Sequence, residues 1–547
     1  MNTNTHERTN SAQGNDEDEI MMSGRLPLIN PGPSKTQNKA QEVRSNQIAP
    51  LPESSKKDSG KNKGTQEESN NNTEINSKGK KEEPKKAVYQ HKNKLLNITR
   101  MLTLVCSNYC FGYYLIIGGV LAPTLTELVY KLPEDERNQA TGNFGFFFAV
   151  GCIVSNIFSG MLTKYVGRVR LVLVMEVCKI IHSLVYRVED INVFFAMRFV
   201  SGILGGIGIG LIPLIINEMI PKDLTGYGGC LSFTWITIFL LAGALQSPIF
   251  GRKEGLEDHW QNVLAWPLVV SIICIVLTLL TMFGMETPNY YYEHYADKED
   301  VLKEKVSVFA KRVYTEESAV QFTEDFIAEK KRIREASKGK KFGVKSLFGP
   351  KYRKQFALGC ILNILQQMTG VNFMNFFATQ LFDDISGNGA EMTIVMTLGN
   401  VVGATTSVFV INSGRKPGML YPTIVVTLSL ILMVFAISYE NALLAGIGMF
   451  TYILSFALGF ATIFSVYVVE ILPPLGAGLA FSTQWVTAAV LGFLGAPMLD
   501  WVGIEVIVII FIVCTIFSCL IMWLFCNETA GKTEEEIRNS FIGVKAE

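Results

Sequence analysis

Long apolar blocks dominate the chain from Leu95 onward, and they constrain its fold more than any other feature. A helix rises about 1.5 Å per residue, so about 20 apolar residues cross the hydrocarbon core of a bilayer. Blocks of this kind span 101–122, 141–163, 169–187, 192–217, 227–250, 263–284, 355–382, 391–412, 417–438, 443–470, 476–500 and 503–526. Because they are continuous and do not alternate with polar residues, they exclude a closed β-barrel and predict an all-α membrane protein with twelve transmembrane helices.

Two polar regions complete the predicted domain organisation. Residues 1–95 are rich in Asn, Lys, Glu, Ser and Gln, and such a segment cannot bury enough apolar surface to order itself. We expect a disordered N-terminal tail there, with no cleavable signal. The linker 286–354 separates two six-helix halves, 96–285 and 355–527, and its stretches 300–312 and 317–335 predict amphipathic helices under the membrane. A C-terminal tail, 528–547, follows.

Basic residues predict the orientation, because loops rich in Lys and Arg stay in the cytosol. They gather in the linker and in alternate gaps between blocks, at Lys164, Arg168, Arg170, Arg415 and Lys416. The other gaps are poorer in basic residues and carry acidic ones such as Glu134, Asp135, Asp383 and Asp384. We therefore expect both termini to be cytoplasmic.

Composition excludes several classes of function. Lys plus Arg and Asp plus Glu are equal at 49 each, so no net charge favours a nucleic-acid partner. The ten cysteines lie inside apolar blocks, without the spacing of a metal site or a disulfide framework. We find no nucleophile motif and no phosphate-binding loop, so the sequence predicts neither an enzyme nor a bound metal or cofactor.

The ends of corresponding blocks in the two halves resemble each other. Gly167-Arg168 follows block two and Gly414-Arg415 follows block eight, while Glu218 and Glu470 each stand three residues before a proline, after blocks four and ten. Repeated halves are typical of transporters. A guanidinium binds a carboxylate through a rigid fork, so we interpret Arg168 with Glu218, and Arg415 with Glu470, as gating salt bridges. The alternative is that these residues only mark loop ends near lipid headgroups.

Block seven carries an unusual number of uncharged amides. Asn363, Gln366 and Gln367 share one helical face with Gly370, while Asn372 and Asn375 share another with Thr379. A break at Thr369-Gly370 would let both faces line one cavity. Amides donate and accept hydrogen bonds, which suits a ligand made of hydroxyl groups. The alternative is hydrogen bonding between neighbouring helices.

Block eleven adds Gln484-Trp485 inside an apolar run. A Trp face beside an amide suits a sugar ring, although a membrane Trp is more often an interface anchor. Trp485 lies well inside its block, which weakens the anchor interpretation. Asn400 in block eight completes the predicted site, with Gln366, Gln367, Asn372 and Gln484 hydrogen bonding to the solute. The supporting residues are Asn363, Asn375, Asn400 and Trp485.

Several motifs together resemble the sugar porter family of the major facilitator superfamily, which includes the facilitative glucose transporters. They are Arg198-Phe-Val-Ser-Gly202, Glu286-Thr-Pro288, Gln366-Gln367-Met-Thr-Gly370-Val-Asn372 and Glu528-Thr-Ala-Gly531-Lys-Thr533-Glu-Glu-Glu536-Ile. The resemblance runs from about Phe111 to Ile537. It implies the major facilitator fold and sugar-binding roles for Gln366, Gln367 and Asn372, and it aligns Gln484-Trp485 with the family's helix-eleven Asn-Trp.

Departures from the family pattern bear on the substrate and on coupling. Lys164 stands where an Asp or Asn is usual, Thr225 replaces an Arg, Phe233 replaces a helix-five Gln, and residues 461–465 lack the proline-rich break and Trp of helix ten. Proton-linked relatives carry an Asp where this chain has Tyr114, and a phenol does not titrate near neutral pH. Glu176 is a candidate for such coupling, because a carboxylate inside a membrane is a functional candidate by default. The interpretation that we favour is an i, i+3 ion pair with Lys179 near the cytoplasmic side.

The sequence therefore predicts a uniporter that moves a small polar solute, a hexose, by alternating access. We expect a monomer in the plasma membrane, with the solute and the bilayer as its partners. The alternatives are a proton-linked carrier of a polyol or organic ion, and a sugar sensor that does not transport.

Overall fold

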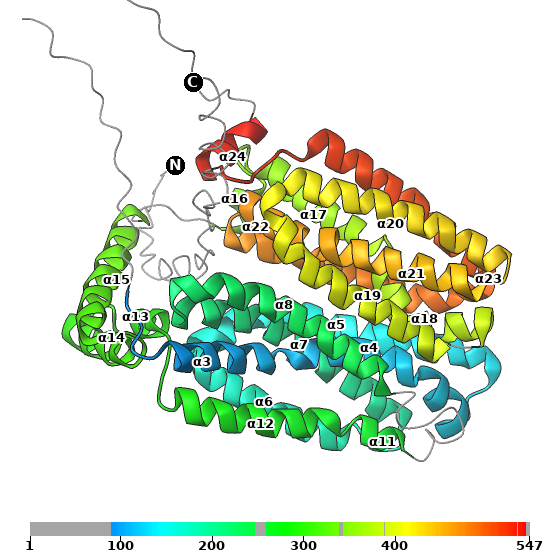
Figure 1. The fold of residues 1–547 in the computed structure, drawn as a ribbon, viewed down its shortest axis with the longest axis horizontal. Coiled ribbons are helices and arrows are strands. Elements are labelled where there is room, and N and C mark those ends of the chain that lie inside the picture. The colour runs from blue at the N-terminus through cyan, green and yellow to red at the C-terminus, as the bar shows by residue number, and fades with distance from the viewer. Residues whose placement is uncertain (1–88, 247–258, 338–342, 388, 533, 543–547) are drawn as a thin grey trace, which may run out of the picture. The chain divides into compact units, whose positions relative to one another are not determined.

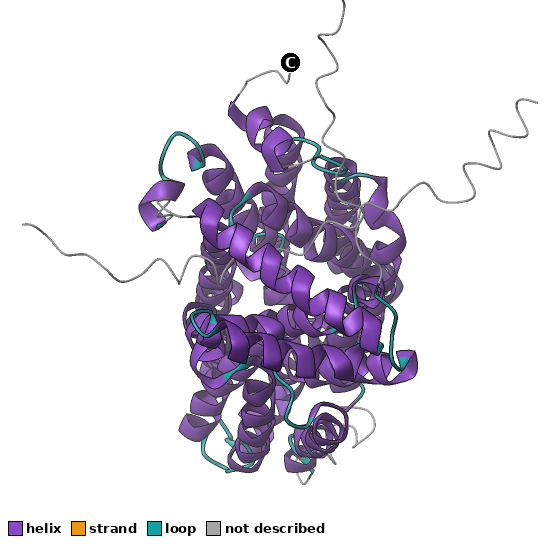
Figure 2. Cartoon of the chain, turned by 90° about the vertical axis from the view of Figure 1, so that its left-hand side faces the viewer, coloured by secondary structure: helices purple, strands orange, loops and turns teal. Residues whose placement is uncertain are grey.

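Helices form all the regular structure of the residues described by the computed structural model, which are 89–246, 259–337, 343–387, 389–532 and 534–542. One isolated antiparallel bridge joins His91 to Tyr314. Figure 2 shows helices joined by loops. The predicted disordered tail, as far as residue 88, lies outside the described residues.

The first half contains helices from α3 to α12. Their bounds are α3 Lys94–Ser107, α4 Tyr109–Pro123, the π-helix η1 Thr124–Val129, α5 Glu134–Val166, α6 Arg168–Val185, α7 Ile191–Met219, α8 Lys222–Ala244, α11 Trp260–Val263 and α12 Trp266–Met282. α3, α4 and η1 together make helix 1 of the bundle, interrupted at Asn108. In Figure 1 these helices, blue to green, lie side by side.

The linker contributes α13 Pro288–Tyr295, α14 Glu299–Val313, α15 Glu316–Ser337 and the short α16 Val344–Leu347. α14 and α15 fall close to the two predicted amphipathic stretches. They pack on each other, and α13 packs on α14. The end of the bundle at which α13, α14 and α15 lie is called the linker end below (Figure 1).

The second half contains helices from α17 to α24. Their bounds are α17 Arg353–Gln367, α18 Val371–Ser386, α19 Gly389–Val410, the 3-10 helix η2 Ile411–Ser413, α20 Arg415–Ser438, α21 Ala442–Phe456, the π-helix η3 Ala457–Ile463, α22 Phe464–Ile471, α23 Pro474–Phe525 and α24 Glu534–Ile542. α24 packs on α22 at the linker end.

Nine helical stretches of the described residues are long and apolar enough to cross a membrane. One of them, α23, is divided at Gly503, whose φ of 75° interrupts the helix. The charged α6 and the pair of short helices α17 and α18 are not among the nine. Dividing α23 and adding α6 and the α17–α18 pair gives the twelve predicted spans.

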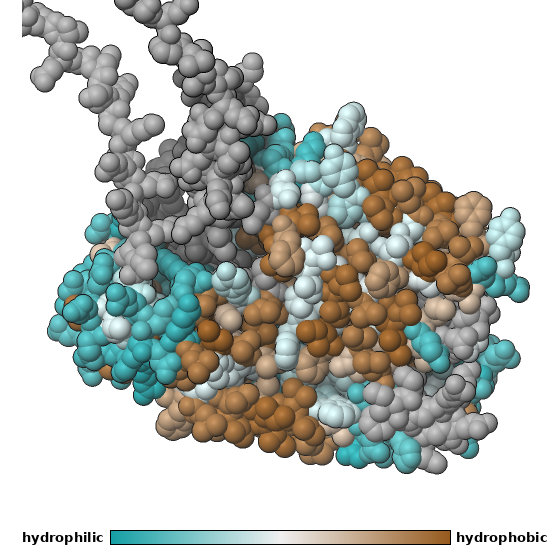
Figure 3. All heavy atoms as spheres, in the orientation of Figure 1, coloured by the Kyte–Doolittle hydropathy of each residue, from teal (hydrophilic) through white to brown (hydrophobic). Residues whose placement is uncertain are grey.

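Apolar side chains cover the flanks of these helices. Figure 3 shows them over the faces formed by α12 and α20, while hydrophilic side chains gather over α13–α15. On α12 alone, Val269, Ile273 and Leu280 are exposed. Large exposed apolar surfaces of this kind have no counterpart on a protein surrounded by water, and they fit an integral membrane protein.

Capping side chains and glycines with positive φ determine where several helices begin. Asn93, Asp190, Thr287 and Asn441 each accept hydrogen bonds from backbone N–H groups in the first turn of α3, α7, α13 and α21. These N-caps satisfy donors that a helix cannot satisfy itself. Gly167 and Gly414 have φ of 92° and 120°, which lets the chain turn sharply before α6 and α20.

The predicted boundary of the tail at residue 95 needs correction. Helix 1 begins at Lys94, and the residues before it are bound to the linker: Lys92 N donates to Val313 O at 3.1 Å, and Thr315 N donates to Gln90 O at 3.0 Å. The Tyr89 ring also lies 5.4 Å from the rings of both Tyr314 and Phe322. These contacts join segments far apart in sequence, so composition alone misses them.

Close contact between α5 and α7 depends on glycine. A Cβ at Gly151 would lie 2.1 Å from the Phe199 carbonyl oxygen, and one at Gly202 would lie 2.0 Å from the Phe148 carbonyl oxygen. No side chain larger than hydrogen fits at either position while the helices keep this distance. Gly160, on the same helix α5, has no described heavy atom within 4 Å of such a Cβ.

We therefore expect Gly151→Leu to destabilise the fold and Gly160→Leu to leave it nearly unchanged. Overpacking a tight contact costs about 1–3 kcal/mol or more. Thermal unfolding of the two purified variants in one detergent checks this, with Gly160→Leu as the matched control. Equal melting temperatures would show that α5 and α7 do not pack as described.

Candidate functional site

Helix 7 of the bundle is broken in its middle, at the position that the sequence predicts. α17 ends at Gln367 and α18 begins at Val371, and Gly370 between them has φ of 90°. A Cβ at Gly370 would also lie 2.4 Å from the ring of Phe511. Both the backbone conformation and the packing therefore require glycine at this position. The Tyr452 hydroxyl donates to the Thr369 carbonyl at 3.1 Å and so satisfies one acceptor that the break exposes.

The amides predicted to bind the solute gather around this break. Asn372 Nδ2 donates to Gln367 Oε1 at 2.7 Å, and Asn375 Nδ2 donates to Asn372 Oδ1 at 3.5 Å. Gln366 Nε2 donates to the Phe460 carbonyl at 2.7 Å, across to the π-helix η3. Asn363 Nδ2 donates to Gly359 O, inside its own helix. The break thus connects the two amide faces through hydrogen bonds.

Three of these amides have a buried oxygen without a hydrogen-bond partner among the described residues. The atoms are Asn363 Oδ1, Gln366 Oε1 and Asn375 Oδ1. Leaving a buried polar atom unpaired costs about 1–3 kcal/mol. Such acceptors can take hydrogen bonds from water or from ligand hydroxyl groups.

The other predicted binding residues are less closely connected. Trp485 is buried, and its ring makes T-shaped contacts with Phe111 at 5.6 Å and Phe148 at 6.4 Å. It therefore joins the two halves. Neither Asn400, which is buried, nor Gln484, which is half-buried, has a hydrogen-bond partner among the described residues.

The halves touch toward the end opposite the linker. A Cβ at Gly142 of α5 would lie 2.5 Å from the Gly492 carbonyl oxygen of α23, and Asn138 Nδ2 donates to Asp500 Oδ1 at 2.7 Å. Gly160 lies about five turns from Gly142 and so on the same face of α5. Neither Gly160 nor Gly478 of α23 has a described heavy atom within 4 Å of an added Cβ. The two helices therefore touch at one end and present open faces at the linker end.

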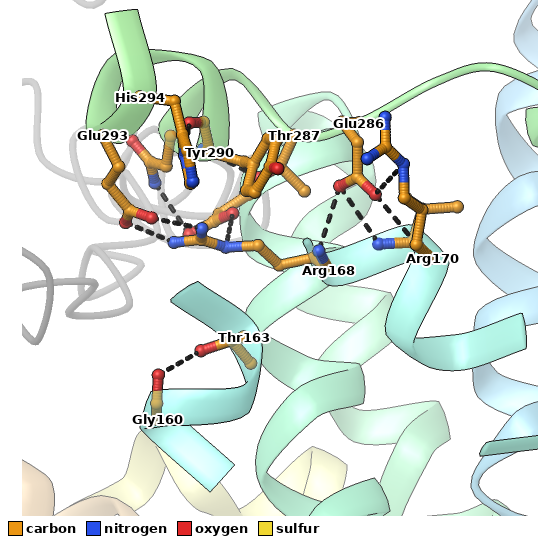
Figure 4. A network of polar contacts seen from close by, with 12 residues as sticks. Gly160, Thr163, Arg168, Arg170, Glu286, Thr287, Tyr290, Glu293 and His294 are labelled. Atoms are coloured by element: carbon orange, nitrogen blue, oxygen red, sulfur yellow. Dashed lines mark hydrogen bonds and ion pairs between the residues drawn. The ribbon is translucent and has the colours of Figure 1, made fainter. Parts of the chain in front are cut away.

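Arg168, predicted to pair with Glu218, lies within a larger polar network that includes Glu293 and Glu286 (Figure 4). Arg168 Nε is 3.3 Å from Glu218 Oε2, without hydrogen-bond geometry. The two Arg168 Nη atoms donate to the two carboxylate oxygens of Glu293, both at 2.5 Å. Glu293, on α13 of the linker, is therefore the bidentate partner, and Glu218 also accepts from Asn289 Nδ2 at 2.8 Å.

Arg415 and Glu470 form the corresponding pair in the second half. Arg415 Nε and Nη2 donate to Glu470 Oε1 at 3.1 Å and 3.0 Å. The other carboxylate oxygen accepts from Thr529 Oγ1 at 2.5 Å. Each predicted gating pair thus exists as a buried contact, tied to the segment that follows the last helix of its half.

Two motif glutamates cap the helices that carry these arginines. Glu286 accepts from the backbone N–H groups of Arg168, Val169 and Arg170 at 3.0, 3.2 and 2.9 Å. Glu528 accepts in the same way from Arg415 N at 2.8 Å and Lys416 N at 3.1 Å. A carboxylate at a helix N-terminus satisfies free donors and faces the positive end of the helix dipole.

Burial works to raise the pKa of the Glu528 carboxyl, but hydrogen bonds from four backbone N–H groups outweigh it and hold the pKa below its usual value. A lowered pKa in the folded state means that this cap stabilises the fold at neutral pH. The stabilisation is lost as the pH falls through the lowered pKa.

Sequence reasoning missed Glu293 and the capping role of Glu286 and Glu528. The two caps lie within quoted motifs, and their shared Glu-Thr pattern was the available signal. Glu293 stands seven residues after Glu286, about two helical turns, but nothing in the sequence distinguishes it from other linker carboxylates. Phe111, Phe148 and Tyr452 carried no signal either.

Comparison with known proteins adds an independent finding. The family described as "Sugar (and other) transporter" matches residues 99–541. The chain is 26% identical over 425 residues to the solute carrier family 2, facilitated glucose transporter member 3 of Ovis aries, covering 72% of this chain and 81% of that protein. It is 24% identical over 467 residues to hexose transporter 1 of Plasmodium falciparum (isolate 3D7), covering 79% and 90%.

The fold is similar to that of the xylose transporter XylE from E. coli, solved in a partially occluded inward open conformation. The TM-score is 0.65 at 18% identity, over 80% of this chain and 100% of that one. At this identity the likeness shows the fold alone, which is the major facilitator fold.

A double-mutant cycle tests the Arg415–Glu470 pair. Arg415→Glu places a carboxylate beside Glu470 and Glu528, and breaking a buried pair costs about 3–5 kcal/mol. We expect Arg415→Glu/Glu470→Arg to regain part of that loss, because it restores opposite charges. Thermal unfolding of both single variants and of the double variant measures the coupling. If the double variant loses at least as much stability as the two single variants together, the two residues are not coupled. The ion pair then does not stabilise the fold.

Proposed function

The chain belongs to the sugar (and other) transporter family, and on that premise we propose that it carries a hexose across a membrane by alternating access, as a uniporter. The proposal rests chiefly on one observation, the unpaired buried amide oxygens around the break in helix 7. It goes beyond family membership, because the family includes transporters of other solutes. The following observations support it.

The three unpaired oxygens, on Asn363, Gln366 and Asn375, are hydrogen-bond acceptors that lack donors among the described residues. A sugar presents several hydroxyl groups, each of which can donate to such an oxygen. The Gln366 amide nitrogen is already bound to the Phe460 carbonyl, so we propose that Gln366 acts on the solute as an acceptor. Gln367 and Asn372 hold this arrangement by their own bond and border the same site.

Alternating access is supported by the different packing at the two ends. α5 and α23 touch at the end opposite the linker, while Gly160 and Gly478 toward the linker end have no described heavy atom within 4 Å of an added Cβ. Buried Arg–Glu pairs stand at the linker end of each half and can separate or hold as the halves rock. We propose that Arg168 with Glu218 and Glu293, and Arg415 with Glu470, stabilise the linker-end gate.

Uniport is supported by the lack of a carboxylate in the middle of helix 1. Between Lys94 and Val129 the only acidic residue is Glu127, at the end of the helix. Tyr114 carries a phenol there, hydrogen bonded to His182 Nδ1 at 3.2 Å. A phenol does not exchange protons near neutral pH, so helix 1 offers no group for proton coupling.

The linker end is proposed to face the cytosol, as the basic residues of the linker indicate. One chain contains both halves of the proposed site, so a monomer suffices for transport. The plasma membrane as its location stays a prediction.

Gln366→Leu should weaken transport while leaving the protein folded. Each hydrogen bond contributes about 0.5–1.5 kcal/mol, so losing one should raise the half-saturating hexose concentration by about 2- to 10-fold. Uptake of labelled glucose into proteoliposomes measures this. Gln321→Leu, an exposed amide on α15, is the matched control. Unchanged uptake by Gln366→Leu would remove Gln366 from the site.

A counterflow panel of hexoses, pentoses and polyols separates the proposed uniporter from other carriers. We expect exchange of a hexose that is equally fast with and without a pH gradient. Exchange that collapses when the gradient is dissipated would indicate a proton-linked carrier. Binding of a sugar without any counterflow would indicate a sensor.

A further inference from the structure

A pair of opposite charges is buried in the middle of α6, outside the site described above. The side chains of Glu176 and Lys179 are 0% and 1% exposed, so both charges are removed from the protein surface. The predicted ion pair between Glu176 and Lys179 is confirmed, and it lies in the central part of α6. Burying two charges is costly, so the pair calls for an explanation beyond stability.

The Lys179 ammonium binds at the interruption of helix 1. Its Nζ donates to the carbonyl of Ser107, the last residue of α3, at 2.8 Å and to Glu176 Oε1 at 2.7 Å. The Tyr109 ring, at the start of α4, lies 4.9 Å from the same nitrogen. The last carbonyls of a helix lack partners within the helix, and the ammonium supplies one.

Helix 7 shows that a break of this kind does not require a charge. There the neutral Tyr452 hydroxyl satisfies the Thr369 carbonyl. At helix 1 the chain instead places a full cation and matches it with a carboxylate, of which the second oxygen, Oε2, has no described hydrogen-bond partner. Transporters bind a coupling cation through oxygen ligands of this kind, a carbonyl at a helix break together with a carboxylate.

The interruption of helix 1 positions contacts with the other half. α4, which begins directly after it, carries Phe111 against Trp485. It also carries Gly119, where an added Cβ would lie 2.6 Å from the Asn375 carbonyl oxygen. A change in the geometry of this interruption would therefore move α4, whose residues contact Trp485 and the segment of helix 7 that carries the amides.

We propose that the Lys179 ammonium is a tethered cation, filling a cation site made by the Ser107 carbonyl and the Glu176 carboxylate. It holds the interruption of helix 1 at Asn108 in the geometry that transport requires. The carrier therefore needs no coupling metal ion, and removing the ammonium leaves a site that accepts a small external cation. Lys179 is a positioning residue, since it acts on the solute only through helix 1. The inference rests on the proposed function for its transport readout.

The test replaces Lys179 by alanine and supplies the missing atoms from solution. n-Propylammonium has the three carbons and the ammonium that Lys179→Ala removes. In choline medium we expect glucose uptake by this variant to fall at least about tenfold, because small displacements at a site have large effects on rate. n-Propylammonium, and more weakly Na⁺ or K⁺, should restore uptake severalfold without affecting the unaltered protein. Full uptake in choline, or no rescue by any of these cations in a folded variant, overturns the proposal.

A second variant keeps the proposal testable if Lys179→Ala does not fold. Glu176→Gln/Lys179→Met removes both charges together, so no unpaired charge is buried. We expect it to fold with a melting temperature near that of the unaltered protein, to transport slowly, and to gain nothing from n-propylammonium. Transport at the unaltered rate by this double variant overturns the proposal. Lys331→Ala is the matched control, because its ion pair with Glu299 has the same 2.7 Å separation but is exposed.

A readout that does not depend on transport separates this inference from the proposed function. A ligand that binds only the folded state raises the melting temperature. n-Propylammonium should therefore raise the melting temperature of Lys179→Ala, but not that of the double variant or the unaltered protein. If the unaltered protein takes up no hexose, the proposed function fails, and this thermal shift alone decides the inference. No shift in Lys179→Ala then overturns it.

Discussion

The structure depends on one constraint: lipid supplies no hydrogen-bond partners, so the backbone polar groups of a membrane-spanning segment must be satisfied inside the protein. Unbroken helices meet it automatically, so the informative places are the interruptions. Helix 7 breaks at Gly370, and Tyr452 satisfies the Thr369 carbonyl. Helix 1 is interrupted at Asn108, and Lys179 satisfies the Ser107 carbonyl. Both breaks lie in the first helix of a half and therefore at corresponding positions.

The same constraint explains why the two ends of the bundle differ. At the linker end, arginines and glutamates are buried, and each is held by several partners. Glu286 and Glu528 cap the helices that follow Gly167 and Gly414. The Arg168 side chain binds Glu293 in the same segment as its cap, whereas the Arg415 side chain binds Glu470 on α22. Because these contacts join the last segment of each half to its third helix, each half is tied together independently. That arrangement leaves the halves free to move against each other.

The amides of helix 7 connect helix segments, and we propose that they also bind the solute. Asn372 with Gln367, and Gln366 with the Phe460 carbonyl, use one donor each to connect helix segments. The remaining oxygens of Asn363, Gln366 and Asn375 have no hydrogen-bond partner within the part of the chain that the structure describes. In the proposed site these amides are organised before the solute arrives, and the solute would supply the missing donors. Weak binding is expected from a few such bonds, which suits a carrier that must release its cargo.

The sequence by itself determined the class of fold, because the length and continuity of apolar blocks leave no other structure for a chain in lipid. It also predicted the break at Gly370 and the partners Arg168 with Glu218 and Arg415 with Glu470, since repeated local patterns carried that information. Only the tertiary structure decided that Glu293 binds both Nη atoms of Arg168. It also decided that Trp485 contacts Phe111 and Phe148, and that Lys179 binds helix 1. These contacts join residues far apart in the chain. No local pattern encodes such a pairing, because helix packing alone sets which faces meet.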